Sequence, residues 1–308
     1  MGRELREVYV STLAALAKED PRVVVLEADL SSSIGTNKLK DQLQDRYINV
    51  GIMEAEEVGV AAGMSIVGFI PFIHSFGPFM TRRVFDQVFL SLGYSQRHAI
   101  LIGSDPGVAA EVNGGTHMPF EDVALMRTIP NVNIYEPSNA EEFEAVLRYA
   151  YKTPALHYIR VVRKAVPEVP TQFKPVEEGY SIVKEGKDGT IFACGLTVKE
   201  AYEAATKLEA DTGYSYEVID LYRIKPLNEN LLLNAAKKGP ILVAENHNAI
   251  GGLGSAIAEF LAENAPTKVV RMGVREQFGQ VGKTDYLLEV YGLNAPAIYS
   301  QAKSLLEK

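Results

Sequence analysis

The chain has 308 residues, of which 47% are hydrophobic and 23% are charged, and its formal net charge is −8. This length suits two ordinary domains with separate cores, and an acidic chain without a basic cluster is not expected to bind nucleic acid or an anionic membrane. No apolar run approaches the roughly 20 residues of a membrane span, and the five histidines lack zinc-like spacing. We therefore expect no membrane association and no metal site made by this chain alone. The single cysteine, Cys194, fits a reducing compartment, and we expect a cytoplasmic protein.

The first half alternates short apolar runs with amphipathic segments of helix length, which is typical of a parallel sheet with helical crossovers. The expected strands are 23–27, 47–50, 69–73, 99–102, 132–135 and 156–160. Two of the expected helices span 81–92 and 138–151. The second begins at Ser138 and carries Glu141 three residues later, which is the spacing of a capping box.

The segment Asn49–Met64 reads as the end of a strand, a glycine turn at Gly51 and a helix with Glu54 in its first turn. Small residues recur at three- and four-residue spacing on one face of this helix: Ala55, Gly59, Ala62 and Gly63. Because glycine inside a helix costs ~1 kcal/mol relative to alanine, this stripe indicates that another backbone or a flat ring packs close. Glu54 could hydrogen-bond a ring nitrogen there or merely complement the helix dipole, and the segment alone leaves both readings open.

A long irregular stretch, 103–119, follows one of the expected strands and contains four glycines and two prolines. Loops of this length are usually functional or mobile, and ligands of parallel sheets bind beyond the carboxyl ends of the strands. Residues 164–175 contain three prolines and predict an extended linker. The alternation then resumes with expected strands at 190–194, 216–220, 241–245 and 268–272 and helices at 198–211 and from about Gly254.

Five sequence blocks, in order and at the right spacing, resemble the C-terminal half of transketolases, which are thiamine-diphosphate enzymes. The blocks are EADLSSS at 27–33, NVGIMEAEEVGVAAGMS at 49–65, HSFGPFMTRRVFDQV at 74–88, NGGTHMPFEDVALMRTIPN at 113–131 and IDLYRIKPL at 219–227. The THMPFEDVALMR part of the fourth block distinguishes transketolases from the beta subunits of 2-oxo acid dehydrogenases, which share the two-domain plan. The resemblance extends from about Arg6 to Leu293.

The resemblance implies an α/β protein with two domains, each a mostly parallel sheet with helices on both faces. We expect a pyrimidine-binding domain at 1–165, a linker at 166–176 and a transketolase C-terminal domain at 177–308. The family's diphosphate-binding domain holds Mg²⁺ or another divalent cation through a Gly-Asp-Gly motif and a later asparagine, and this sequence contains no Gly-Asp-Gly. We therefore expect one subunit of a split transketolase, paired with an N-terminal-section subunit in an α2β2 assembly. A piece of a longer chain is the alternative explanation.

For the cofactor, thiamine diphosphate, the resemblance assigns Glu54 as the catalytic carboxylate that hydrogen-bonds a nitrogen of the aminopyrimidine ring. Phe76 and Phe79 match aromatic residues that line the pyrimidine pocket, although both could simply belong to the core. Asp29 matches an aspartate near the cofactor, and its alternative role is to cap the turn after a strand.

For the substrate, the resemblance assigns His117 as a catalytic histidine that contacts the hydroxyl groups of the donor ketose. Arg6, Ser33 and Arg160 match residues that contact the substrate phosphate. Arg160 closes an expected strand, where a guanidinium can form paired bonds to a phosphate. Arg6 lies on an amphipathic first helix, and it could equally belong to a solvated face.

Two positions depart from the family pattern. Asp105 stands where transketolases carry a second substrate histidine near the phosphate, and Asn113 stands where an aspartate reads the hydroxyl configuration of the donor. Because a carboxylate repels a phosphate, we expect altered specificity for the sugar or for its anionic end.

We expect transfer of a two-carbon ketol unit from a ketose phosphate to an aldose phosphate. The alternatives are a thiamine-dependent synthase or 2-oxo acid dehydrogenase beta-type subunit, and a non-catalytic stabilising or regulatory paralogue. The THMPFEDVALMR block argues against the first alternative. The presence of Glu54 together with both phenylalanines argues against the second.

Overall fold

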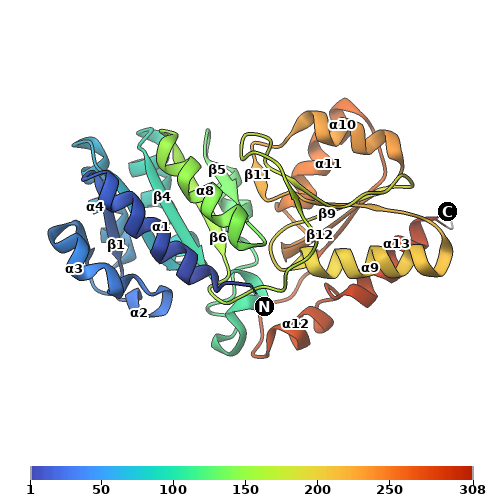
Figure 1. The fold of residues 1–308 in the computed structure, drawn as a ribbon, viewed down its shortest axis with the longest axis horizontal. Coiled ribbons are helices and arrows are strands. Elements are labelled where there is room, and N and C mark those ends of the chain that lie inside the picture. Colours follow the sequence, from blue (N-terminus) through green and yellow to red (C-terminus); the bar gives the residue numbers. More distant parts are fainter. Residues whose placement is uncertain (1, 307–308) are drawn as a thin grey trace.

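The computed structural model describes residues 2–306 and has two α/β units side by side, coloured blue to green and yellow to red in Figure 1. The apolar runs of the first half all form strands of one sheet, and these strands are parallel to one another. They are β1 (Val23–Glu27), β2 (Tyr47–Asn49), β3 (Ile70–Phe76), β4 (Ala99–Ser104), β5 (Asn133–Tyr135) and β6 (Leu156–Val161). Their order, β5-β6-β4-β3-β1-β2, brings their carboxyl ends to one edge of the sheet.

Helices cover both faces of this sheet. On one face α1 (Leu5–Glu19) packs against α8 (Ala140–Lys152), in front of the sheet in Figure 1, and α4 (Glu54–Ile66) lies on the other face. The other helical segments of this half are short: α2 (Ser31–Ile34), η1 (Thr36–Leu39), α3 (Lys40–Leu43), η2 (Gln44–Arg46), α5 (Gly77–Met80), η3 (Arg82–Val84), α6 (Phe85–Gln87), η4 (Val88–Tyr94), η5 (Gly107–Asn113) and α7 (Asp122–Arg127). The single helix predicted at 81–92 is divided in the structure, because the backbone dihedral angles of Val84 lie outside the helical region.

The helix predicted at 138–151 spans Ala140–Lys152, and its N-cap lies one residue later than the predicted capping box indicates. Asn139 is the N-cap, and its side chain accepts the backbone N–H of Glu142 at 3.0 Å. The carboxylate of Glu142 in turn accepts the backbone N–H of Ser138 at 3.0 Å. The predicted capping box is thus shifted by one residue, because the buried carboxylate is Glu142 and Glu141 faces solvent.

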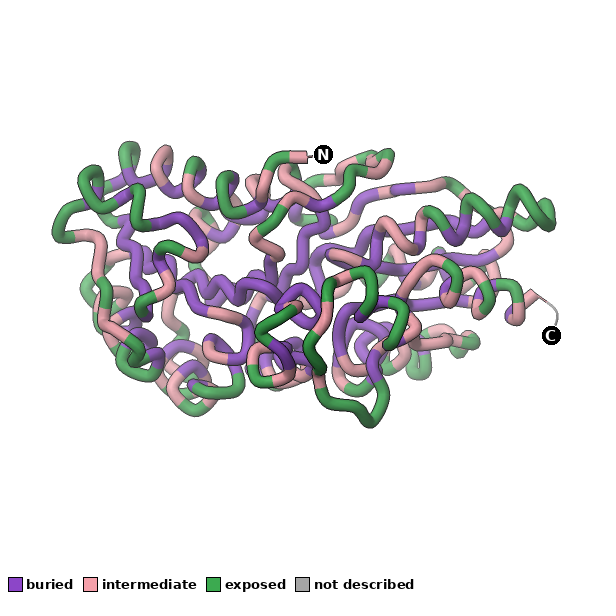
Figure 2. The backbone as a smooth tube through the Cα atoms, turned by 90° about the horizontal axis from the view of Figure 1, so that it is seen from below, coloured by how far each residue is buried: buried purple, intermediate pink, exposed green. Residues whose placement is uncertain are grey.

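The second unit has a six-stranded sheet in the order β13-β12-β9-β10-β8-β7. Its strands are β7 (Gln172–Phe173), β8 (Ser181–Lys184), β9 (Thr190–Ala193), β10 (Glu217–Asp220), β12 (Ile241–Asn248) and β13 (Val269–Val274), and its helices are α9 (Thr197–Thr212), α10 (Glu229–Lys238), α11 (Leu253–Asn264), α12 (Thr284–Val290) and α13 (Ala295–Leu306). The central strands are parallel, whereas β7 and β8 add an antiparallel edge, so the proline-rich linker contributes a short strand to this sheet. In Figure 2 the buried backbone runs through the middle of both units.

The two units are joined by a strand and by a buried ion network. Strand β11 (Arg223–Lys225) leaves the second unit and pairs antiparallel with β5 at the edge of the first sheet. Next to this boundary, the fully buried Arg160 of β6 donates its Nε–H to Asp122 at 2.6 Å and pairs with Glu136. It also donates to the backbone carbonyl of Asn246 in β12 at 2.9 Å. One guanidinium therefore links both units inside the protein.

Replacing Arg160 with methionine should destabilise the protein strongly, because the carboxylates of Asp122 and Glu136 would be left buried without a counter-charge. We expect the free energy of unfolding to fall by about 3–5 kcal/mol, measured by urea denaturation. The matched control is Arg148→Met, which removes an exposed ion pair with Glu144 and should cost less than about 1 kcal/mol. Equal stability of the two variants would contradict a structural role for the Arg160 network.

Candidate active site

The first turn of α4 places Glu54 at the carboxyl edge of the first sheet. The side chain of Asn49, at the end of β2, accepts the backbone N–H groups of Asp29 and Gly51, both at 3.0 Å. Gly51 has a φ of 75°, a conformation that favours glycine, and it lets the chain turn directly into the helix. The side chain of Glu54 is consequently only 4% exposed.

Three aromatic rings from three different segments form a cluster that is linked to Glu54 through Arg83. Phe76 ends β3, Phe79 belongs to α5, and His117 comes from the loop after η5. The centroid of the His117 ring lies 5.0 Å from that of Phe79 and 5.8 Å from that of Phe76, in edge-to-face geometry. Burial and the neighbouring charge of Arg83 lower the pKa of His117, so its imidazole is neutral near neutral pH.

The guanidinium of Arg83 lies between Glu54 and this aromatic group. Its carbon is 3.6 Å from the centroid of Phe79, and its Nη1 donates to Glu54 Oε1 at 2.6 Å. A planar N–C–N group therefore rests on an aromatic face while it donates to a buried carboxylate. An aminopyrimidine ring is also planar and nitrogen-edged, so the residues present fit such a ring. The Arg83 side chain is 45% exposed and has room to leave.

A second cluster, at the ends of β4 and β6, contains an arginine that the sequence patterns do not single out. Arg163 donates its Nε–H to Asp105 at 2.6 Å and its Nη1–H to the backbone carbonyl of Ser33 at 3.1 Å. Its guanidinium lies 5.1 Å from the centroid of Phe76, next to the aromatic group. The backbone carbonyl of Arg163 accepts the N–H of Arg6 at 3.0 Å. Ser33 and Asp105 are thus brought together around the Arg163 guanidinium, whereas Arg6 contacts Arg163 only through the backbone.

The structure corrects the role expected of Arg160. Its guanidinium has no exposed surface and is surrounded by Asp122, Glu136 and a backbone carbonyl, so a substrate phosphate cannot reach it. Arg163, three residues later and beyond the end of the strand, is partly exposed and occupies the position that Arg160 was expected to have. The signal in the sequence is the second arginine of RVVRK, which follows the last strand residue.

The remaining predicted residues, Asp29, Asn113 and Arg6, lie on the solvent-exposed rim of the site. Asp29 is exposed at the end of β1 with a φ of 61°, and Asn113 is exposed at the end of η5. The side chain of Arg6 pairs with Glu4 at 2.6 Å and is 44% exposed. None of these three is in direct contact with Glu54 through a hydrogen bond among the described residues.

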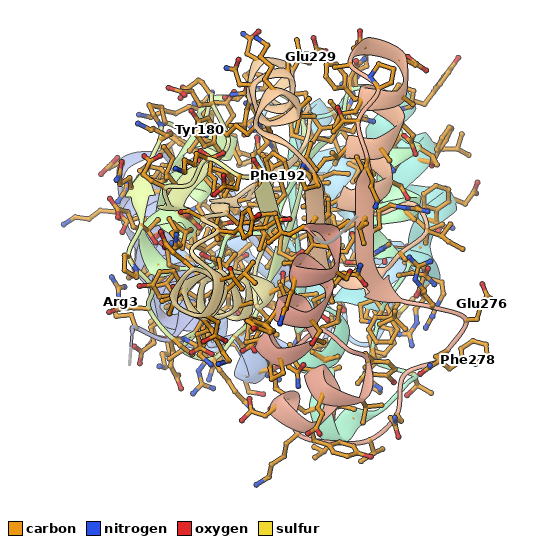
Figure 3. All side chains as sticks on the ribbon, turned by 90° about the vertical axis from the view of Figure 1, so that its right-hand side faces the viewer. Arg3, Tyr180, Phe192, Glu229, Glu276 and Phe278 are labelled. Carbon is orange, nitrogen blue, oxygen red and sulfur yellow. The ribbon has the colours of Figure 1, made fainter. Side chains whose placement is uncertain are left out.

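The loop that carries His117 is held from the second unit. The amide side chain of Asn246 accepts the N–H of Val108 and donates to the carbonyl of Pro106, both at 2.9 Å. Gly115 packs against Gly279. A Cβ on Gly115 would collide with the backbone of Gly279, and a Cβ on Gly279 would collide with the side chain of Met118. Gly279 belongs to the segment 275–283, which projects from the second unit. This segment presents Phe278 to solvent in Figure 3, and 96% of that residue is exposed.

Within residues 2–306, no group of three or more histidine, cysteine, aspartate or glutamate side chains is arranged to hold a metal ion. None of the helices described in this range combines the length and the hydrophobicity that crossing a membrane requires.

Comparison with known families and proteins gives a consistent result. The family model for the transketolase pyrimidine binding domain matches residues 2–168, and that for the transketolase C-terminal domain matches residues 179–298. A 6-deoxy-6-sulfo-D-fructose transketolase subunit from Clostridium sp. (strain MSTE9) is 43% identical over 99% of this chain and 95% of its own length. A putative transketolase C-terminal section from Methanocaldococcus jannaschii is 33% identical over 99% of this chain and 96% of its own length.

Among solved structures, a split gene transketolase described as an inactive beta4 tetramer is 38% identical and superposes with a TM-score of 0.89 over 100% of this chain and 99% of that one. Mouse transketolase is 31% identical, and the match covers 98% of this chain but only 49% of the mouse protein. The chain therefore belongs to the transketolase family of ketol-transferring enzymes, and it corresponds to the C-terminal-section subunit of a split transketolase.

Proposed function

We propose that this subunit supplies the pyrimidine half of a thiamine-diphosphate site and that the assembled enzyme transfers a two-carbon ketol unit between sugars. The observation that carries the proposal is the contact of Arg83 with Glu54 and Phe79, in which a flat nitrogen-containing group lies on the aromatic ring while it donates to the carboxylate. When bound, thiamine diphosphate supplies an electron sink for carbon–carbon cleavage. Glu54 holds the proton shared with the ring nitrogen, and Phe76 and Phe79 pack against the ring. The neutral His117 faces the hydroxyl groups of the donor, with Asp29 and Asn113 on the rim.

The partner in this proposal is an N-terminal-section subunit that holds the diphosphate and a divalent cation such as Mg²⁺, in a cytoplasmic α2β2 heterotetramer. The absence of a Gly-Asp-Gly motif from the sequence supports it. A second support is the outer face of α4, where a Cβ on Gly59 or Gly63 would meet nothing within 4 Å. Large apolar residues are exposed around these glycines and on the neighbouring η4: Ile52, Met53, Ile66, Val67, Leu90 and Tyr94. Exposed large apolar side chains on two neighbouring elements are typical of a subunit interface.

Co-expression with the neighbouring open reading frame should give a heteromer that binds thiamine diphosphate and turns over ketose, whereas this chain alone should do neither. Within the heteromer, Glu54→Gln should lower kcat by about 10²–10⁴-fold, because the shared proton is lost, and assembly should be unchanged. The matched control is Glu56→Gln, an exposed glutamate of the same helix turn. Activity of the Glu54 variant within a few-fold of the control, or turnover by this chain alone, would contradict the proposal.

Arg83→Met should tighten cofactor binding, because Arg83 competes with the ring for Glu54 and Phe79. A cation–π contact and one charged hydrogen bond no longer have to be broken, so we expect the Kd for thiamine diphosphate to fall roughly three- to tenfold, measured by calorimetry on the heteromer. Arg82→Met is the control, since Arg82 pairs with Glu121 instead. Weaker binding by the Arg83 variant would show that this arginine binds the cofactor rather than yielding to it.

The anionic end of the substrate has a specific environment in this proposal. Arg163 is the cation that would receive it, with Ser33 and the backbone of Arg6 beside it. Asp105 already compensates the charge of Arg163, so a dianionic phosphate meets a carboxylate as well as a guanidinium. The Arg163–Asp105 pair therefore favours a substrate whose anionic group carries a single negative charge. The relative from Clostridium is named for a sulfonated fructose, and a sulfonate carries one charge. We therefore propose a ketose with a monoanionic end, such as a sulfonate, alongside the ketose phosphates.

Restoring the family residue with Asp105→His should shift the preference toward phosphorylated ketoses. Like charges about 4 Å apart cost about 1 kcal/mol even in water, so we expect the ratio of kcat/KM for fructose 6-phosphate to that for its 6-sulfo analogue to rise roughly fivefold. Asp105→Asn serves as the control that removes the charge but not the shape of the side chain. An unchanged ratio in both variants would exclude Asp105 from substrate recognition.

A further inference from the structure

Asn246, near the end of β12, is a fully buried residue whose side-chain hydrogen bonds cross from the second unit to the first. Its Oδ1 accepts the N–H of Val108, and its Nδ2 donates to the carbonyl of Pro106, both at 2.9 Å. Its backbone carbonyl accepts a hydrogen bond from Arg160, also at 2.9 Å. An amide side chain has one acceptor side and one donor side, and Asn246 uses both on residues of one loop.

These bonds fix the beginning of a closed loop, residues 107–119. The N–H of Gly107 donates to the carbonyl of Pro119 at 3.2 Å, so the two ends of the loop meet next to the buried amide. Gly107 has a φ of 52°, and a Cβ at this position would collide with the amide. At the far end of the loop, the N–H of Asn248 donates to the carbonyl of Phe120 at 2.9 Å. Strand β12 therefore holds the loop at both of its ends.

This loop carries the residues that the proposed function assigns to the donor sugar. His117 and Asn113 both lie within it. The residues proposed for the cofactor ring, Glu54, Phe76 and Phe79, belong to α4, β3 and α5, which lie outside the loop. The amide of β12 is thus linked directly to the proposed donor contacts, whereas the ring contacts have supports of their own.

We propose that Asn246 is a positioning residue for donor recognition, which holds the loop 107–119 in the arrangement in which His117 meets the donor sugar. The inference rests on the proposed function, and it gives the second unit a role in substrate binding. An enzyme whose loop adopts this arrangement for only a fraction of the time binds its donor more weakly by that fraction. Because a bound donor itself holds the loop, the loss should appear in KM rather than in kcat.

Steady-state kinetics of Asn246→Ala in the heteromer test this, with fructose 6-phosphate or its 6-sulfo analogue as the donor and a saturating aldose phosphate as the acceptor. We expect the donor KM to rise about tenfold, because a buried hydrogen-bonding pair is lost, while kcat and the Kd for thiamine diphosphate stay within about twofold. The matched control is Asn248→Ala, whose side chain accepts the N–H of Ile250 at 2.8 Å within the second unit. It should leave all three quantities unchanged. A general loss of folded enzyme would lower kcat at constant KM, and that result would overturn the inference.

Asn246→Asp provides a rescue by pH. A protonated aspartic acid has the shape, the donor and the acceptor of the amide, whereas the ionised form only accepts and faces the carbonyl of Pro106. Burial disfavours the ionised form and so raises the pKa of this carboxyl, and the contacting cation, Arg160, is already neutralised by Asp122 and Glu136. The donor KM of this variant, relative to that of the wild type, should therefore fall toward one as the pH decreases. A KM as high as that of Asn246→Ala at every pH would contradict the inference.

Hydrogen exchange on the unmodified heteromer keeps the inference testable if the variants fail to assemble. The amide proton of Val108 is the one that Asn246 binds, so a ligand that favours the held loop should slow its exchange several-fold. The probe is the alditol phosphate made by reduction of fructose 6-phosphate, which lacks the carbonyl group and is not cleaved. An unchanged exchange rate of Val108 at saturating alditol phosphate would overturn the inference.

The same amide separates this inference from the proposed function. In this chain alone and without any ligand, Asn246→Ala should speed the exchange of Val108 roughly tenfold, and Asn248→Ala should not. Equal exchange rates in the two variants would overturn the inference even if the heteromer is an active transketolase. Failure of the wild-type heteromer to turn over ketose would instead contradict the proposed function, and faster exchange in Asn246→Ala would still show that this side chain holds the loop.

Discussion

The position of one carboxylate governs the arrangement of the site. Glu54 is held where β2 ends and α4 begins, by an asparagine side chain that ties the ends of β1 and β2 together and by a glycine with positive φ. Because the first six strands are parallel, the ends of β3, β4 and β6 reach the same edge, and they deliver Phe76, Asp105 and Arg163 to it. The chemistry of the site thus follows from a property of parallel sheets rather than from any single loop.

Two arginines three residues apart show how the end of a strand decides the role of a side chain. Arg160 lies within β6 at the boundary of the two units, where the acids of α7 and the segment after β5 neutralise it away from water. Arg163 lies beyond the strand, where the chain is free to turn toward the open edge. The first arginine is structural, and the second is the one that we propose to meet an anionic ligand. A substitution at either position therefore affects a different property of the protein.

Local sequence patterns predicted most of the first sheet, because its central strands β1, β3, β4 and β6 are rich in apolar residues and buried on both faces. The same reasoning missed β8 and β11, which are short and contain lysine or arginine, so they have no apolar signature. The turn at Gly51 and the position of Glu54 were also readable, since glycine and the helix start lie within a few residues. The pairing of Arg83 with Glu54 and of Arg163 with Asp105 was not, because these contacts join residues 29 and 58 positions apart.

The exposed face of α4 connects assembly to the buried acids. The glycines that keep this face flat and the carboxyl groups of Glu54 and Glu57 belong to one helix of 13 residues, with the glycines outside and the acids inside. Covering the face excludes water from the start of the helix, which strengthens every electrostatic interaction there and increases the cost of an unpaired charge. Subunit association and the environment of Glu54 are therefore coupled through the same helix. In the assembly that we propose, the partner subunit covers this surface, so the start of α4 loses its contact with water only when the two subunits associate.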